Sequence, residues 1–208
     1  MKTLLVDYSY LYYRCKFAYR AIKKNIGGVV YDTGAAFGYQ RYLRIFQEVY
    51  PKVVICLDGK PQKCLDIQDT YKGDREVDKA TFEVSRSDVV ELTLLFPGVE
   101  VWHHPEMEAD EVIAFFTAMR KEPMDIFTTD MDIHQLIDDD RQIAVVNQFN
   151  SKARIFNQVR EADVINKWGV APDEIPIYKA IRGDKSDNIQ GVRSEERRVG
   201  KECRSRWS

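Results

Sequence analysis

The stretch Thr3-Leu4-Leu5-Val6-Asp7 is a mostly apolar run that ends in a carboxylate. Two later stretches have the same form: Val53-Val54-Ile55-Cys56-Leu57 before Asp58, and Ile126-Phe127-Thr128-Thr129 before Asp130. Short apolar runs of this kind are typical of parallel strands that are covered on both faces. In open α/β sheets, ligands bind beyond the carboxyl ends of such strands. The three stretches therefore predict a mostly parallel sheet with carboxylates gathered at one edge.

Segments with helical spacing alternate with these runs, and the alternation supports an α/β fold with right-handed crossovers. Helices are expected over residues 8 to about 24, 33–50, 108–120, 133–137, 158–168 and 173–182. Further strands are expected over residues 99–102, 142–147 and 153–156. The segment 59–97 is different, because apolar residues are sparse in its first half and it predicts weak packing on the core.

The composition is that of an ordinary water-soluble protein with one sizeable core. The chain has 208 residues, of which 44% are hydrophobic and 31% are charged. No apolar run approaches the roughly 18 residues that a membrane span needs, and because the chain begins directly with a strand-like run we expect no secretory signal. The cysteines lack the spacing of a zinc site, so we expect reduced thiols and a cytoplasmic protein: Cys15, Cys56, Cys64 and Cys203.

Eight carboxylates fall at five places where they are more useful for holding cations than for folding: Asp7, Asp58, Glu108, Asp110, Asp130, Asp132, Asp184 and Asp187. All are oxygen donors, which favour Mg²⁺ or Mn²⁺ over zinc. Eight are too many for one Mg²⁺, and two ions roughly 4 Å apart are a standard arrangement for phosphodiester hydrolysis. Taken singly, each acid has an alternative role as a helix cap, a dipole partner or a solvated loop residue.

The net charge is −2, from 31 basic and 33 acidic residues, so the chain outside the eight carboxylates is mildly basic. Such a distribution suits an anionic ligand. Arg14, Lys72 and Arg75 are candidates for positioning phosphates, and Tyr71 is a candidate for stacking on a base. The alternative for each cation is a solvated surface residue. The tyrosines between residues 8 and 13 are expected to serve packing.

Six short motifs carry a resemblance to a known family: Val-Asp7-Tyr-Ser-Tyr-Leu, Leu-Asp58-Gly, Tyr71-Lys-Gly-Asp-Arg75, Glu108-Ala-Asp110-Glu, Thr-Thr-Asp130-Met-Asp132-Ile and Gly183-Asp184-Lys-Ser-Asp187-Asn-Ile. In order and spacing, from residue 3 to residue 192, the chain resembles the 5′→3′ exonuclease and flap endonuclease family. That family includes phage 5′ nucleases and the 5′-nuclease domain of bacterial DNA polymerase I.

The resemblance implies a PIN-like α/β fold with a helical arch inserted at about residues 59–97. It also implies a structure-specific nuclease that cuts DNA at 5′ ends or flaps during replication or repair. All eight carboxylates would then hold two Mg²⁺ or Mn²⁺ ions. Lys72 and Arg75 would be catalytic residues at the base of the arch, and Arg14 would contact the substrate. We expect a monomer in the cytoplasm of a bacterial or phage-infected cell.

The chain departs from the family pattern at three positions and at its end. Tyr8 stands where Gly is common, Glu111 where Asp is frequent, and Gln190 where Pro is usual. We assign residues 1–192 to the nuclease domain and expect a truncated helix–hairpin–helix region after it. Residues 193–208 resemble a translated sequencing adapter and are expected to be non-native; a natural basic tail is the alternative. A non-catalytic nucleic-acid-binding module and a PIN-type ribonuclease are the alternative functions.

Overall fold

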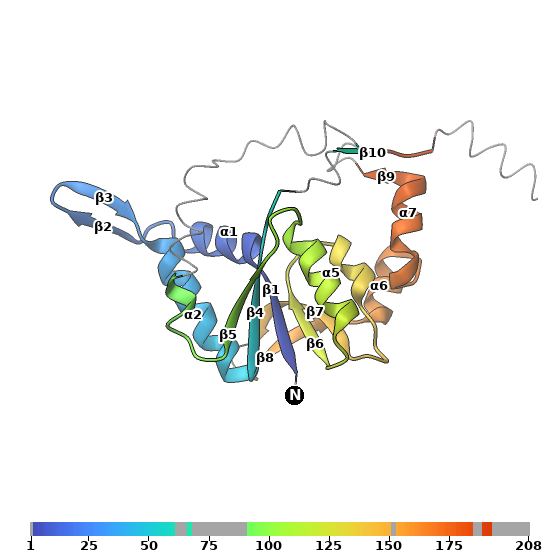
Figure 1. Ribbon diagram of the computed structural model, residues 1–208, viewed down its shortest axis with the longest axis horizontal. Coiled ribbons are helices and arrows are strands. Elements are labelled where there is room, and N and C mark those ends of the chain that lie inside the picture. The colour runs from blue at the N-terminus through green and yellow to red at the C-terminus, as the bar shows by residue number, and fades with distance from the viewer. Residues whose placement is uncertain (1, 61–65, 68–90, 151–152, 185–188, 193–208) are drawn as a thin grey trace, which may run out of the picture.

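The computed structural model of the protein describes residues 2–60, 66–67, 91–150, 153–184 and 189–192. Within these ranges a six-stranded sheet has the strand order β5-β4-β1-β6-β7-β8 (Figure 1). All neighbouring strands are parallel except β7 and β8, which are antiparallel. The strands are β1 (Thr3–Asp7), β4 (Lys52–Leu57), β5 (Val99–His103), β6 (Met124–Phe127), β7 (Ile143–Asn150) and β8 (Ile155–Val159).

Helices cover both faces of the sheet and give a three-layer architecture (Figure 1). One face carries α1 (Tyr8–Ala18) and α2 (Gly34–Val49). The other face carries α5 (Ala109–Met119), α6 (Glu161–Trp168), α7 (Ile175–Arg182) and two 3₁₀ turns, η1 (Asp132–Leu136) and η2 (Pro172–Glu174). The expected mostly parallel α/β fold is confirmed. None of the helices in the described ranges has the length and apolar character needed to cross a bilayer.

Each central strand supplies side chains to both cores, which explains why its sequence is continuously apolar. In β1, Leu4 and Val6 face α1 and α2, whereas Leu5 faces α5; all three are fully buried. Strand β4 alternates in the same way, with Ile55 on the first face and Val54 on the second. Successive side chains of a strand point to opposite faces, so a strand that is covered on both sides needs apolar residues throughout.

The order of the strands places a topological switch point at β1, in the middle of the sheet. From β1 the chain passes through α1 and α2 on one face and returns as β4. From β5 it passes through α5 on the other face and returns as β6, on the other side of β1. Ligands in open α/β sheets bind in the crevice at such a point, beyond the carboxyl ends of the strands. Asp7 lies at this position.

The region after α1 differs from the sequence-based expectation. The helix expected over residues 8 to about 24 ends at Ala18, and a hairpin follows, formed by β2 (Lys23–Ile26) and β3 (Val29–Asp32). Gly27 and Gly28 both have positive φ, of 61° and 87°. A two-residue turn with positive φ at both positions matches the twist of a hairpin, and β-branched residues follow it. Sequence reasoning missed both strands that flank this turn.

Two further expected helices are shorter than predicted. The helix expected over residues 158–168 begins at Glu161, because residues 155–159 pair with β7 as the edge strand β8. The helix expected over residues 173–182 is divided into the 3₁₀ turn η2 and the α-helix α7. In the first case strand pairing, which a local pattern does not encode, decides where the helix begins.

Asp125 is a buried carboxylate whose role is structural, and its removal provides a first prediction. Its side chain accepts hydrogen bonds from Tyr50 Oη at 2.6 Å and Gln158 Nε2 at 2.9 Å, and it forms an ion pair with Lys2. Asp125→Ala leaves these partners unpaired, so we expect a loss of about 3 kcal/mol in the free energy of unfolding. Urea denaturation checks this, with the exposed Asp140→Ala as the matched control. A loss below about 1 kcal/mol would contradict the assignment.

Candidate functional site

Three predicted carboxylates meet at the carboxyl edge of the sheet. Asp7 ends β1, Asp58 follows β4 by one residue, and Asp130 follows β6 by three residues. Strand β1 lies between β4 and β6, with Asp7 opposite Cys56 and Val6 opposite Phe127 in the two registers. Because three neighbouring parallel strands end together, their following residues share one site. The sequence-based expectation of a common acidic edge is met by these three residues.

Asp7 caps helix α1, and its carboxyl group has a raised pKa. Its Oδ1 accepts a hydrogen bond from Tyr10 N at 3.1 Å and caps α1, and its Oδ2 accepts one from Thr128 Oγ1 at 3.0 Å. Burial, followed by the negative charge of Asp58, raises the pKa of Asp7 to about 7, and Asp130 adds a smaller effect. The two hydrogen bonds act in the opposite direction but are outweighed. Capping alone therefore does not account for this residue.

Asp58 joins the end of β4 to the start of α5. Its Oδ1 accepts a hydrogen bond from Ala109 N at 3.0 Å, and its Oδ2 accepts one from Ser9 Oγ. Gly59 permits this approach, because a Cβ at this position would lie 2.1 Å from the carbonyl oxygen of His104. The Gly59 N–H also donates to Met107 O at 2.6 Å. The close backbone contact holds Asp58 against the segment that carries Glu108.

Glu108 and its neighbours fulfil the alternative role of a helix start. Glu108 is the N-cap of α5, and its own N–H donates to Glu111 Oε2 at 2.9 Å in a capping box. Asp110 lies in the first turn, where the helix dipole favours acids. Glu111, at the position where the family frequently has Asp, thus reaches back to the N-cap. A carboxylate has about four lone-pair positions, so a helix-capping Glu108 can also serve as a metal ligand.

A second group of carboxylates is joined by a lysine that sequence reasoning missed. Lys179, in the last turn of α7, donates hydrogen bonds to Asp132 Oδ1 and to Asp184 Oδ2, the latter at 2.6 Å. The second group is connected to the first, because Asp132 N donates to Asp130 Oδ1 at 2.9 Å. Lys179 lies five residues before Asp184, one turn from the helix end. That short spacing is the only signal in the sequence for the contact with Asp184, and the contact with Asp132 has none.

Asp184 is positioned by a short antiparallel ladder. Strand β9 (Gly183–Asp184) pairs with β10 (Ile189–Gln190), with Asp184 opposite Ile189. Gly183 has φ of +83°, and a Cβ there would lie 2.3 Å from the backbone nitrogen of Gly191. Only glycine fits this combination of positive φ and close backbone approach. The Asp184 side chain is 13% exposed and turns toward Lys179.

Arg14 is held by two tyrosines on the first face of the sheet. Its Nε donates to Tyr42 Oη at 2.6 Å, another nitrogen donates to Tyr10 Oη at 2.5 Å, and its guanidinium carbon lies 5.7 Å from both ring centroids. These contacts raise the pKa of Arg14. The side chain is half-buried and is held by the two tyrosine hydroxyls. The guanidinium keeps further N–H groups for an anion.

Several predicted site residues lie outside the described residues: Tyr71, Lys72, Arg75 and Asp187. Most of the expected arch region and the segment 193–208 also lie outside them. The structure therefore places seven of the eight predicted metal ligands and one of the four predicted nucleic-acid contacts. The tyrosines expected to serve packing do so where described, since Tyr8 and Tyr12 are buried in the core.

The described carboxylates supply the oxygen atoms that a hard divalent cation prefers, but they do not surround a common point. Among the described residues, no three His, Cys, Asp or Glu side chains are arranged tightly enough to enclose an ion. The donors are nevertheless all oxygen, and burial, followed by repulsion from the charge of Asp58, raises the pKa of Asp7. A cation among these oxygens would relieve that repulsion. Rotation of carboxylates toward an ion is within the freedom of these side chains.

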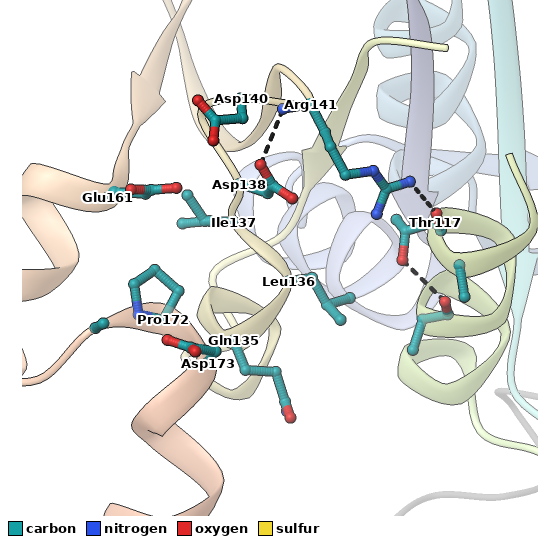
Figure 2. A pocket seen from close by; sticks show the side chains of 13 residues that line it. Thr117, Gln135, Leu136, Ile137, Asp138, Asp140, Arg141, Glu161, Pro172 and Asp173 are labelled. Atoms are coloured by element: carbon teal, nitrogen blue, oxygen red, sulfur yellow. Dashed lines mark hydrogen bonds between the residues drawn. The ribbon is translucent and has the colours of Figure 1, made fainter. Parts of the chain in front are cut away.

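A cavity of about 510 Å³ lies apart from these carboxylates, between α5, η1, α6 and η2 (Figure 2). None of the predicted site residues lines it. Arg141 closes one side by donating to the carbonyl oxygens of Thr117 at 2.5 Å and Arg120 at 2.8 Å. The cavity is therefore not part of the carboxylate site at the strand ends.

Comparisons with known proteins agree on one family. A family profile described as 5′-3′ exonuclease, N-terminal resolvase-like domain, matches residues 2–169. The chain is 30% identical over 199 residues to a 5′-3′ exonuclease of Aquifex aeolicus, which covers 92% of this chain and 65% of the relative. It is 28% identical to a 5′-3′ exonuclease of Streptomyces coelicolor, covering 91% of this chain and 66% of the relative. The chain thus spans about two thirds of the length of these relatives.

Solved structures share the fold at lower sequence identity. The 5′-exonuclease of phage T5, solved with bound zinc, has a TM-score of 0.67 and 18% identity, and the match covers 93% of this chain and 71% of that chain. The T5 D15 flap endonuclease, solved with DNA and metal ions, has a TM-score of 0.64 and 18% identity, with the same coverage of both chains. At this identity the likeness establishes the fold.

Proposed function

The chain belongs to the 5′-3′ exonuclease family through its N-terminal resolvase-like domain, and from this membership we propose that it is a divalent-metal-dependent nuclease of 5′ DNA ends or flaps. Residues 1–192 form the nuclease domain in this proposal. The reaction is hydrolysis of a phosphodiester bond, and its setting is DNA replication or repair in the cytoplasm. Both named exonuclease relatives support the reaction class.

One observation carries the proposal: the three central parallel strands deliver Asp7, Asp58 and Asp130 to a topological switch point. Strand ends at that point are where α/β sheets bind ligands. Carboxylates gathered there repel one another, and burial together with the charge of Asp58 raises the pKa of Asp7. Such an arrangement is unfavourable for folding and is useful when a cation is bound.

The predicted metal ligands divide into two groups. Asp7, Asp58 and Asp130 would hold one ion together with Glu108 and Asp110, and Asp132, Asp184 and Asp187 would hold the second. When bound, Mg²⁺ or Mn²⁺ ions supply Lewis acidity and stabilise charge on the reacting phosphate. The protein's own hydrogen bonds fix the ligands: Ser9 and the Ala109 N–H orient Asp58, and Thr128 orients Asp7.

The substrate in this proposal is DNA with a single-stranded 5′ end or flap. The T5 flap endonuclease that shares the fold was solved with DNA and metal ions, which supports this class of substrate. Arg14 lies on α1, which starts from Asp7, and the N–H groups that it does not donate to Tyr42 or Tyr10 would reach a backbone phosphate near the carboxyl edge. Lys72 and Arg75 would act from the arch as catalytic residues, with Tyr71 stacking on a base.

A flap cleavage assay tests the proposal. A labelled 5′-flap duplex is incubated with the protein in Mg²⁺, in Mn²⁺, in Ca²⁺ and in EDTA, and the products are sized on a denaturing gel. We expect cleavage near the junction of single and double strand in Mg²⁺ or Mn²⁺, and none in EDTA. A single-stranded RNA of the same sequence is the control substrate. Absence of cleavage by both the 208-residue chain and a version extended to the length of its relatives would refute the nuclease proposal.

A further inference from the structure

The Lys179 ammonium group lies between two of the predicted metal ligands. It contacts Asp132 Oδ1 and Asp184 Oδ2, and the three side chains are partly enclosed, with exposed fractions of 24% for Lys179, 30% for Asp132 and 13% for Asp184. The two acids come from separate elements, η1 and β9, and Lys179 from a third, α7. One side-chain cation thus joins carboxylates that lie 52 positions apart in the chain.

We propose that Lys179 is a built-in counter-cation that competes with a divalent metal ion for Asp132 and Asp184. The inference rests on the proposed function, because it takes these acids to be metal ligands. An ammonium that donates to a carboxylate oxygen occupies the direction from which a metal ion would bind that oxygen. A divalent ion can therefore bind both acids only after the lysine side chain has moved away. The flexible four-carbon stem of lysine permits that movement.

The two groups of predicted metal ligands differ in whether a lysine is paired with them. Within the described part of the chain, no Lys or Arg forms an ion pair with Asp7, Asp58 or Asp130, so no side-chain cation there offsets the repulsion among these acids. At Asp132 and Asp184 the repulsion is already relieved by Lys179. An entering ion gains less there, because it replaces an existing cation rather than filling an uncompensated site. The protein should thus bind one ion tightly and a second ion more weakly.

Replacement of Lys179 by methionine tests this directly, since methionine keeps the length of the stem and removes the charge. Binding of Mn²⁺ is measured by isothermal titration calorimetry on the 208-residue protein without DNA. Lys179→Met is expected to tighten the weaker Mn²⁺ site at least about tenfold. The control is Lys121→Met, which removes an exposed lysine of equal charge before β6, at the opposite edge of the sheet. The control should change neither site by more than about twofold.

Conservative replacement and unfolding experiments separate competition from a general structural role. Lys179→Arg keeps the charge and should keep the weaker site within about threefold of its original affinity. Without metal, Lys179→Met should melt at a lower temperature than the parent, because Asp132 and Asp184 then repel each other. Added Mn²⁺ should raise its melting temperature more than that of the parent, since an ion that binds the folded state stabilises it.

The outcomes decide the matter in either direction. Unchanged or weaker Mn²⁺ binding in Lys179→Met would overturn the proposal, as would a variant that stays unfolded at every Mn²⁺ concentration. Tighter Mn²⁺ binding in Lys179→Met would support the competition proposal. If the parent protein then failed to cleave a flap, only the nuclease proposal would be refuted. Cleavage by the parent combined with unaltered binding in the variant would leave the nuclease proposal standing and remove this one.

Discussion

Replacement of Asp130 by alanine is expected to lower flap cleavage at least about a thousandfold while DNA binding stays measurable. Asp130 follows β6, and its charge contributes to the raised pKa of Asp7. Its Oδ1 accepts a hydrogen bond from the N–H of Asp132. It therefore belongs to the first carboxylate group and adjoins the second. Removing it takes away a predicted metal ligand without opening the apolar core, because the side chain is exposed. Binding of DNA depends more on basic residues than on this acid.

The matched control for Asp130→Ala is Asp140→Ala. Asp140 is exposed and precedes β7, at the opposite edge of the sheet. Both variants lose one negative charge, so a general effect of net charge on DNA binding would appear in both. Initial cleavage rates in Mg²⁺ and affinity for an uncleavable flap in Ca²⁺ are compared. Retention of more than about a tenth of the cleavage rate by Asp130→Ala would show that the metal assignment is wrong.

Replacement of Asp7 by asparagine is expected to abolish cleavage and to stabilise the metal-free protein. Asparagine has the same shape, so it can still accept the N–H of Tyr10 and bond to Thr128. The folded-state pKa of Asp7, at about 7, is above its ordinary value of 3.8. The folded state therefore holds this proton more tightly than the unfolded state does. Stability from this group is full below about pH 4 and is lost as the pH rises toward 7.

Above pH 7 the wild-type protein carries the full cost of a charged Asp7, and the variant does not. We expect Asp7→Asn to be more stable than the wild type by about 4 kcal/mol at pH 8 in EDTA, and by much less at pH 4.5. Urea denaturation at both pH values measures the difference. Saturating Mg²⁺ should stabilise the wild type and have little effect on the variant. A variant that is less stable than the wild type at pH 8 would show that the neighbouring charges are already compensated.

The sheet and its acidic edge were predictable because their signals are local. Residues 3–7, 53–58 and 126–130 each combine a buried strand with the acid that follows it, so the sequence contains both the element and the site residue. Parallel pairing then brings the ends together without further information. The hairpin of β2 and β3 was also encoded locally, in Gly27 and Gly28, but the helical spacing before it was extended too far.

Contacts between distant elements were beyond sequence reasoning. Lys179 meets Asp132 across 47 positions, and no periodic pattern marks that contact. For Glu108 and Asp7 the local sequence contains two signals, because each residue could be part of a helix start or a metal ligand. The structure gives both residues the capping role at positions where a metal ligand is also expected. A pattern of residue types does not distinguish two roles that one side chain can combine.

The two carboxylate groups are supported by parts of the fold that differ greatly in cooperativity. Asp7 ends a central strand of a six-stranded sheet, next to the fully buried Leu4, Leu5 and Val6, and elements of this kind open at free energies close to that of global unfolding. Asp184 belongs to a ladder in which each strand has two residues. Such a ladder opens locally at a small fraction of the global free energy. We therefore expect Asp184 to leave its position more often than Asp7 in the folded protein, which amide hydrogen exchange would detect as slow exchange at Val6 beside fast exchange at Asp184.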